Sequence, residues 1–263
     1  MDLVEASARG YDQAIRHPWE LARLHVIKKI ISKYLLISND SIILDIGCGD
    51  SFVSENLAKE YETSMIYAMD IAFTDEIINN FNQRFNYKNL RLYSSQDELK
   101  NNINKPVTVV LLTDVIEHIK DDVEFLNRLL KQNFIDDKTV FLITVPAYQS
   151  LFCSHDNFLG HYRRYTNKVL MQNTDAAGLT TIENGYFFFT LLPFRLFQVI
   201  KENIFNLKKK ESSTDLATWK GGLFQAEFLK FILICDAEFS FFLKKLGIKL
   251  CGLSNYSLCR KHV

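Results

Sequence analysis

Two glycines separated by one residue follow a short apolar segment that contains an acidic residue, in the sequence SIILDIGCGDS at positions 41–51. The apolar run predicts a buried parallel strand, and Gly47 and Gly49 stand where the chain must turn tightly. Glycine has no Cβ, so the backbone of such a turn can approach a ligand closely. A helix beginning near Phe52 would add free amide donors beside the turn. We therefore expect a nucleotide-type pocket here.

The spacing of this turn argues against a dinucleotide pocket. A dinucleotide fingerprint has glycines at its first, third and sixth positions, whereas the sixth position counted from Gly47 is Phe52. Asp45 stands two places before Gly47, where its carboxylate would repel a pyrophosphate but could help to hold an ammonium group. The turn thus favours a ligand that carries an ammonium group.

Predicted strands and helices alternate along the chain around this turn. Further strands are predicted at 65–72, 90–94, 108–114 and 139–146. Helical periodicity covers 19–36, 52–61 and 121–132. Thr166 is typical of an N-cap and predicts a further helix to about Ala177, with Gly178 at its stop. Such alternation predicts a parallel sheet with helices on both faces, whose ligands bind at the carboxyl ends of the strands. Asp45, Asp70 and Asp114 all come at these ends. One such aspartate is commonly structural, whereas three beside a glycine turn indicate a site.

The segment from Asp45 to Ser51 resembles motif I of the class I S-adenosylmethionine-dependent methyltransferases, which is written acidic-x-Gly-x-Gly-x-Gly. Ser51 takes the place of the third glycine. The segments TDVIEHI at 113–119 and HYRRYT at 161–166 are also similar to that family. The resemblance implies an α/β, Rossmann-like fold with a seven-stranded, mostly parallel sheet and an antiparallel last strand at 254–261, beside the fifth strand. It also implies S-adenosyl-L-methionine as the methyl donor.

The resemblance assigns roles to individual positions. Asp70 would accept hydrogen bonds from both ribose hydroxyls, because one carboxylate offers two acceptor oxygens. Ile71 would pack on the adenine. The other positions implied for the cofactor are Asp45, Gly47, Cys48 and Gly49 at the methionine part, Ser94 to Asp97 near the adenine edge, Thr113 and Asp114 beside the sulfonium, and Val115 and His118 after the fourth strand.

Titratable and aromatic residues are dense at positions 148–165, which hold two histidines, an aspartate, two arginines and three tyrosines. In the methyltransferases that this chain resembles, the loop borders the acceptor pocket. The candidates are His155 or His161 as a general base, Asp156 to orient it, Arg163 or Arg164 for an anionic part of the substrate, and Tyr148 as a further substrate contact. Either histidine could instead only fix this loop by hydrogen bonds.

The chemistry expected of this loop is modest. A sulfonium methyl group is already activated, so an enzyme mainly aligns an acceptor lone pair and removes the proton of a hydroxyl. We expect O-methylation by direct displacement on a small-molecule, saccharide-related or lipid-linked acceptor. The acceptor class rests on the resemblance alone.

Charge and cysteine usage narrow the partners and the compartment. The 31 basic and 31 acidic residues balance, which removes the electrostatic argument for a nucleic-acid partner. Five cysteines without a CxxC pair favour reduced thiols, so we expect no metal site. Positions 1–12 lack a signal pattern, so we expect a cytoplasmic protein. Four prolines and no long polar linker favour a single domain over 1–263 with one insertion.

The insertion, at about 187–246, departs from a minimal methyltransferase core. Twelve of the 21 phenylalanines lie between Phe187 and Phe242, on both sides of a polar tract at 208–222 that we expect to be a loop. We predict a pair of helices, the second with a broad apolar stripe. The stripe would pack on the domain or on a second copy in a homodimer, or else contact a lipid-linked substrate or a membrane surface.

Other interpretations stay open. Trp19, near His17, Glu20 and Arg23, would serve as a packing anchor or as a lid over the cofactor. A nicotinamide-dependent oxidoreductase would share the sheet, but it needs a third fingerprint glycine at the position where this chain has Phe52. A non-catalytic partner subunit with the same fold is the main alternative, and calorimetry with S-adenosylhomocysteine and NAD would separate these hypotheses.

Overall fold

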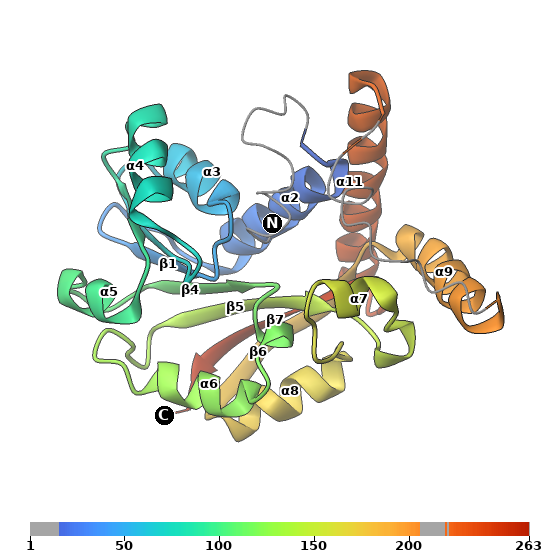
Figure 1. Cartoon of the computed structure of the whole chain (residues 1–263). Helices are drawn as coiled ribbons and strands as arrows, with labels where there is room; N and C mark the ends of the chain where they lie inside the picture. The colour runs from blue at the N-terminus through green and yellow to red at the C-terminus, as the bar shows by residue number, and fades with distance from the viewer. Residues whose placement is uncertain (1–15, 206–218, 220, 263) are drawn as a thin grey trace.

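The computed structural model describes residues 16–205, 219 and 221–262. These residues form a seven-stranded sheet with the order β3-β2-β1-β4-β5-β7-β6 (Figure 1). The strands are β1 (Ile42–Ile46), β2 (Met65–Met69), β3 (Leu90–Tyr93), β4 (Val109–Thr113), β5 (Val140–Pro146), β6 (Leu179–Phe187) and β7 (Ser254–Lys261). β1 to β5 pair in parallel, and β7 is antiparallel to both β5 and β6. The predicted mostly parallel sheet with an antiparallel last strand is confirmed.

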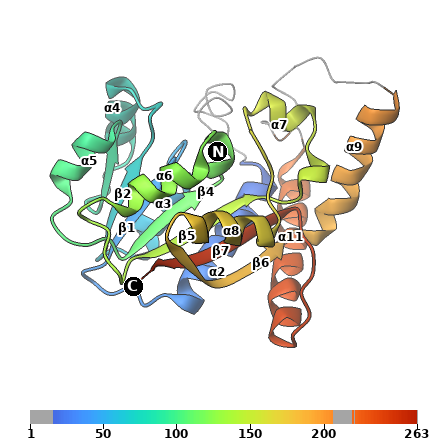
Figure 2. The ribbon, with the colours of Figure 1, turned by 90° about the horizontal axis from the view of Figure 1, so that it is seen from below.

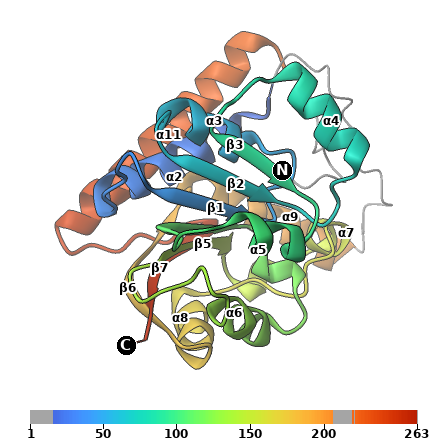
Figure 3. The same cartoon turned by 90° about the vertical axis from the view of Figure 1, so that its left-hand side faces the viewer.

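Helices cover both faces of this sheet (Figures 2 and 3). One face packs against α2 (Pro18–Tyr34), α3 (Phe52–Glu60) and α11 (Leu223–Lys245), with α4 (Asp75–Arg84) at its margin. The other packs against α5 (Gln96–Asn102), α6 (Asp122–Leu130) and α8 (Asn167–Ala176). Adjacent residues of β1 separate the two cores, because Ile43 belongs to the first and Leu44 to the second. Both faces of β1 are therefore buried, as expected of a central parallel strand.

Local capping explains where several helices begin. Thr74, Ser95, Asp121 and Thr166 each accept a backbone N–H of the first turn with a side-chain oxygen. The cap predicted at Thr166 is confirmed, and α8 is followed by Gly178 at φ +98°. These caps fix the ends of the elements that surround the strand termini.

Short elements follow the carboxyl ends of β4 and β5. They are η1 (Ile116–His118), η2 (Gln149–Leu151) and α7 (Ser154–Phe158). The predicted insertion lies between β6 and β7 and comprises η3 (Phe189–Leu191), α9 (Leu192–Phe205) and α11, so the helical pair is present. Most of the tract at 208–222, and all of positions 1–12, lie outside the described residues. Among the described residues, no helix combines the length and apolar character needed to span a bilayer.

Candidate active site

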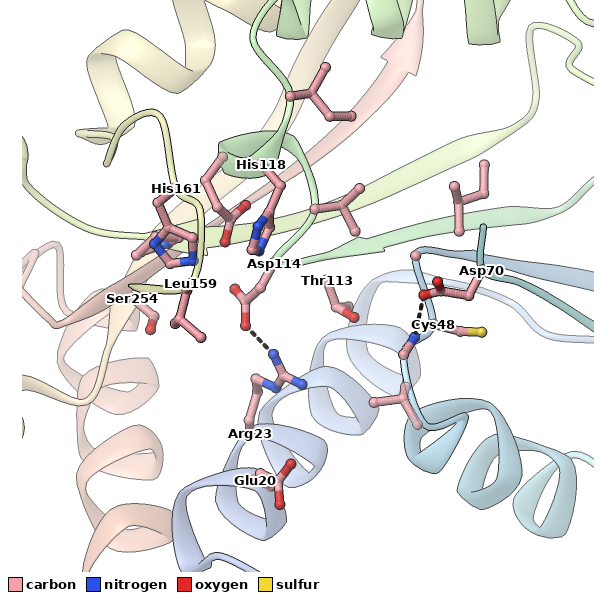
Figure 4. Close-up of a pocket in the computed structure, with 18 of the residues that line it drawn as sticks. Glu20, Arg23, Cys48, Asp70, Thr113, Asp114, His118, Leu159, His161 and Ser254 are labelled. Atoms are coloured by element: carbon pink, nitrogen blue, oxygen red, sulfur yellow. Dashed lines mark hydrogen bonds and ion pairs between the residues drawn. The ribbon is translucent and has the colours of Figure 1, made fainter. Parts of the chain in front are cut away.

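A cavity of about 690 Å³ opens where the parallel strands end. Its lining includes the turn after β1, the residues that follow β2 and β4, α2, and the segment from α7 to α9. In Figure 4, Cys48 and Asp70 lie at one end and His118 and His161 at the other, with Arg23 and Asp114 between them. We name these the glycine-loop end and the histidine end.

The glycine turn adopts a backbone that only glycine tolerates well. Gly47 and Gly49 have φ of +67° and +57°. A Cβ on Gly47 would lie 2.7 Å from Cγ2 of Val115, so the turn is closely packed against the segment after β4. The amides of Gly47 and Cys48 donate to the carbonyl of Met69, at 2.8 and 3.2 Å, and thus tie the turn to β2.

Ser51, at the position of the third motif glycine, also has a left-handed backbone, with φ +61°. This residue directly precedes α3 and is buried. A side chain at positive φ costs about 1–2 kcal/mol relative to the usual region. Ser51 therefore adopts the backbone conformation of the motif glycine that it replaces, at a cost in conformational energy.

Asp45 does not line the cavity, so the geometry does not support direct contact with an ammonium group. Its side chain is fully buried and accepts a hydrogen bond from the Ser54 hydroxyl, at 2.5 Å. Burial raises the pKa of Asp45 to about 6, although the Ser54 hydrogen bond lowers it. The residue connects β1 to α3 beneath the turn.

Asp70 follows β2 and faces the cavity. Its Oδ2 accepts the amide of Gly49 at 2.8 Å, and its Oδ1 accepts the amide of Ala72 at 3.0 Å. Each carboxylate oxygen keeps a further lone pair for a ligand. Ile71, which also lines the cavity, exposes 88% of its side chain. An exposed apolar side chain beside a carboxylate suits a flat ring next to a sugar.

Asp114 and Arg23 form an ion pair in the middle of the cavity. Asp114 has φ +58°, and its Oδ1 accepts the Thr144 hydroxyl at 3.3 Å. Arg23 comes from α2, and its guanidinium lies 4.7 Å from the ring centroid of Trp19. Trp19 lines the cavity and also packs against the core between the sheet and α2, so it serves as a packing anchor and as part of the cavity lining.

Glu117, His118 and His161 gather at the histidine end, with one potential ligand atom from each within 4.8 Å of the others. The Glu117 carboxylate is fully buried and has no hydrogen-bond partner among the described residues. Burial, and then the charge of Asp114, raise its pKa well above the usual range. The rings of His118 and His161 meet edge to face at 4.6 Å. These three side chains could also hold a cation. The expectation of no metal site rested on cysteine ligands alone and so did not include this cluster.

Asp156 is a buried hub that fixes the histidine end. Its Oδ1 bonds His161 Nδ1 at 3.0 Å and Arg164 Nε at 2.7 Å, while Oδ2 accepts Arg195 Nη2 at 2.7 Å. Burial would raise its pKa, but the His161 hydrogen bond and the two guanidinium groups hold the pKa well below its usual range. An ionised Asp156 accepts the Nδ1 proton of His161 and leaves Nε2 as the basic nitrogen.

Comparisons with known proteins come from the sequence and from the fold. No family model matches the chain. Two curated relatives, Ubiquinone biosynthesis O-methyltransferases of Rickettsia bellii strains OSU 85-389 and RML369-C, are each 35% identical over 113 residues. The match covers 41% of this chain and 43% of each relative, so the chain spans under half the length of the curated relatives it matches.

Solved structures match far more of the chain. A chain from a complex of the Haloferax volcanii Trm112 methyltransferase activator aligns with a TM-score of 0.56 and 12% identity, covering 99% of this chain and 95% of its own length. Coclaurine N-methyltransferase bound to N-methylheliamine and SAH gives 0.55 and 12%, covering 92% and 70%. The fold is that of the class I methyltransferases. In that fold the cavity lies at the strand ends where the strand order reverses.

The methyltransferase fold brings together most of the predicted residues, but not all. His155, His161 and Arg164 line the cavity, as do Gly47, Cys48, Gly49, Asp70, Ile71, Thr113, Asp114, Val115 and His118. Tyr148, Asp156, Arg163 and the Ser94–Asp97 segment are not among its lining residues.

Arg163 and Tyr148, both predicted to contact the substrate, have other partners in the structure. Arg163 donates to Asp122 Oδ1 at 2.8 Å and to the Lys120 carbonyl. Tyr148 stacks on Tyr186 with 5.2 Å between ring centroids. Both residues therefore hold the loop to the domain, and neither lines the cavity.

Sequence reasoning missed the contribution of α9. Arg195 and Gln198 line the cavity, and Arg195 also binds Asp156. The signal available was a lone arginine inside an apolar helical segment, where burial requires an acidic partner. Glu20 and Ser254 also line the cavity, and only Glu20 had been grouped with the site.

Proposed function

We propose that the protein is an S-adenosylmethionine-dependent methyltransferase that methylates an acceptor hydroxyl. The observation that carries this proposal is the shared cavity, which connects the glycine turn and Asp70 to the cluster of Glu117, His118 and His161. One compartment thus offers a nucleoside-type subsite and a proton acceptor.

The glycine-loop end supports the cofactor assignment. Asp70 would accept the ribose hydroxyls with the lone pairs that the Gly49 and Ala72 amides leave available. The lack of a Cβ at Gly47 lets the turn pack against Val115, and Ile71 offers an apolar contact for adenine. Bound S-adenosylmethionine would supply an electrophilic methyl group on sulfur.

The histidine end supports the transfer step. We assign the general base to His161, whose Nδ1 is held by Asp156 so that Nε2 can take the hydroxyl proton. His155 also lines the cavity, but burial and then the charge of Arg195 lower its pKa to about 4. A histidine with so low a pKa is a weak base, so His155 is the secondary candidate.

The acceptor is proposed from chemistry and likeness. Apolar Ile119, Phe125 and Leu159 line the cavity together with Arg164. This lining suits a mainly apolar molecule with one ionisable hydroxyl, small or lipid-linked. The curated relatives are O-methyltransferases by name, which favours oxygen over nitrogen. Five cysteines without a disulfide among those described favour a reducing, cytoplasmic setting.

Isothermal titration calorimetry tests the cofactor assignment directly. We expect the purified chain to bind S-adenosylhomocysteine, and Asp70→Ala to weaken binding by about 10- to 100-fold, because a hydrogen bond to a charged group is worth about 1.5–3 kcal/mol. Asp40→Ala, an exposed carboxylate with 91% of its side chain accessible, is the matched control.

The outcomes separate the competing hypotheses. Equal affinity of the Asp70→Ala variant would contradict the cofactor assignment. Binding of NAD without S-adenosylhomocysteine would favour an oxidoreductase, and binding of neither would favour a non-catalytic subunit.

A further inference from the structure

Helix α11 has two apolar faces. Its inner face, with Ala226, Leu233, Ala237 and Phe241, is buried in the core that α2 shares. Figure 1 and Figure 3 show α11 at the margin of the molecule beside α2. The opposite face carries one row of exposed side chains, which we name the outer stripe: Phe224, Phe228, Phe231, Cys235, Phe239, Phe242 and Leu246.

The outer stripe is symmetric about its centre. Its members are four, three, four, four, three and four residues apart, so the spacing is the same in both directions from Cys235. The residue types are nearly symmetric too, with Phe231 and Phe239 on either side, and Phe228 and Phe242 beyond them. A four-three-four spacing repeats every 11 residues, close to the period of a straight helix, so the row keeps one face over about 33 Å.

We propose that two copies of this chain form a dimer in which their α11 helices pack antiparallel around Cys235. A twofold interface is isologous, so each patch must complement itself when reversed. Reversal places Phe231 of one copy opposite Phe239 of the other. The small Cys235 side chain then lies at the twofold axis, where two helices can approach most closely.

The exposed area fits this occupant. The five phenylalanines of the stripe expose between 49% and 84% of their surface, which amounts to roughly 600 Å² for rings of this size. A stable interface buries about 800 Å² on each partner. Leu246, the last member of the stripe, and Ile232 beside it are exposed at 62% and 37%, so they supply most of the remaining area.

The charges beside the stripe also favour a reversed second copy. Glu227, which pairs with Lys230 of its own chain, lies near the start of α11, and Lys245 lies near its end. An antiparallel partner brings Glu227 of one copy close to Lys245 of the other. Glu238, in the middle, is paired with Lys29 and His25 of its own chain. A helix that binds an anionic membrane surface carries mainly basic flanks, whereas this one carries both signs.

Cysteine cross-linking tests the geometry. Cys235 and Cys251 are the exposed cysteines among those described. A short bismaleimide should join two full-length chains in the native protein and in Cys251→Ser, whereas Cys235→Ser should lose the covalent dimer. Cross-linking that needs Cys251, or that fails in all three proteins, would overturn the antiparallel arrangement.

Light scattering tests the dimer itself. We expect a mass twice the 30.6 kDa of one chain, and Phe231→Asp should raise the dissociation constant at least about 100-fold, because each copy would bury an unpaired carboxylate. Val169→Asp on α8, an apolar side chain exposed at 40%, is the matched control. Circular dichroism checks that both variants fold.

A monomeric native protein at tens of micromolar would overturn the proposal, as would a monomer that floats with anionic vesicles. Neither result would bear on binding of S-adenosylhomocysteine, which the calorimetry measures separately.

Discussion

The two ends of the cavity are built in different ways. At the glycine-loop end, backbone amides and one carboxylate form the subsite. Gly47, Gly49 and Asp70 directly follow the paired strands β1 and β2. At the histidine end, Asp156 of α7 binds His161 and Arg164 from the loop after α7 and Arg195 from α9. Glu117 and His118 of η1 join His161 there, so this end combines segments far apart in the sequence. The first end depends on local backbone geometry, and the second depends on long-range charge pairing.

This difference indicates which end can vary. A site made of backbone at strand ends changes little as long as the sheet forms. A site made by loops and an inserted helix can change its acceptor without disturbing the sheet. Substitutions at the glycine-loop end should therefore lower affinity for the cofactor, whereas substitutions at the histidine end should lower turnover.

The largest effect is expected at His161. His161→Ala should lower kcat by about 10²- to 10⁴-fold, because general-base catalysis contributes that much, while S-adenosylhomocysteine binding stays within a few-fold. His155→Ala is the matched control and should keep most of the rate. The measurement is formation of S-adenosylhomocysteine with catechol as a probe acceptor. Similar losses in both variants would remove the distinction between the histidines.

The next effect is expected at Gly47. Gly47→Ala should weaken S-adenosylhomocysteine binding by about 100-fold, because the new Cβ would lie 2.7 Å from Val115 in a backbone at φ +67°. Gly247→Ala has the same left-handed strain, at φ +82°, with nothing within 4 Å of its Cβ. Calorimetry on both variants separates the clash from the strain. Unchanged affinity in Gly47→Ala would show that the turn has room to spare.

A stability effect that depends on pH is expected at Asp45. Its folded pKa of about 6 lies above the unfolded value of about 3.9, so the folded state binds more protons between these values and loses stability as pH rises. Asp45→Asn removes this loss and should be more stable at pH 8 by about 2 to 3 kcal/mol. Urea unfolding at pH 4.5 and pH 8 measures it. A stability difference between Asp45→Asn and the wild-type protein that does not grow from pH 4.5 to pH 8 would contradict the burial argument.

The smallest effect is expected at Ser51. Ser51→Gly should raise the free energy of unfolding by about 1 kcal/mol, because glycine adopts φ +61° without steric cost. Affinity for S-adenosylhomocysteine should change by no more than a few-fold. A destabilised variant would mean that the buried serine side chain contributes more packing than its backbone costs.

The parts of the fold that the sequence predicted have short-range signals. The strand and turn at 42–49 and the cap at Thr166 depend on neighbouring residues, and the structure has them where the patterns indicate. β6 (Leu179–Phe187) was not located, because it alternates poorly and owes its place to pairing with β7. Its burial is intermediate along most of its length, which leaves little periodic signal.

The site was predicted least well where tertiary contacts decide orientation. Arg163 and Arg164 are adjacent and of the same type, yet only Arg164 lines the cavity. Arg163 turns away because Asp122, at the start of α6, attracts it. Arg195 joins the site from an insertion that carried no motif. These orientations depend on contacts between residues far apart in the sequence, so short-range patterns cannot predict them.

The position of β7 has a consequence for how the protein is made. β7 follows every other strand in the sequence, yet it lies inside the sheet between β5 and β6. During synthesis the first five strands can pair as they emerge, while β6 has no neighbour until residues 254–261 arrive. Until then β5 and β6 present open edges to other chains, so the nascent protein passes through an aggregation-prone stage that ends only when β7 inserts.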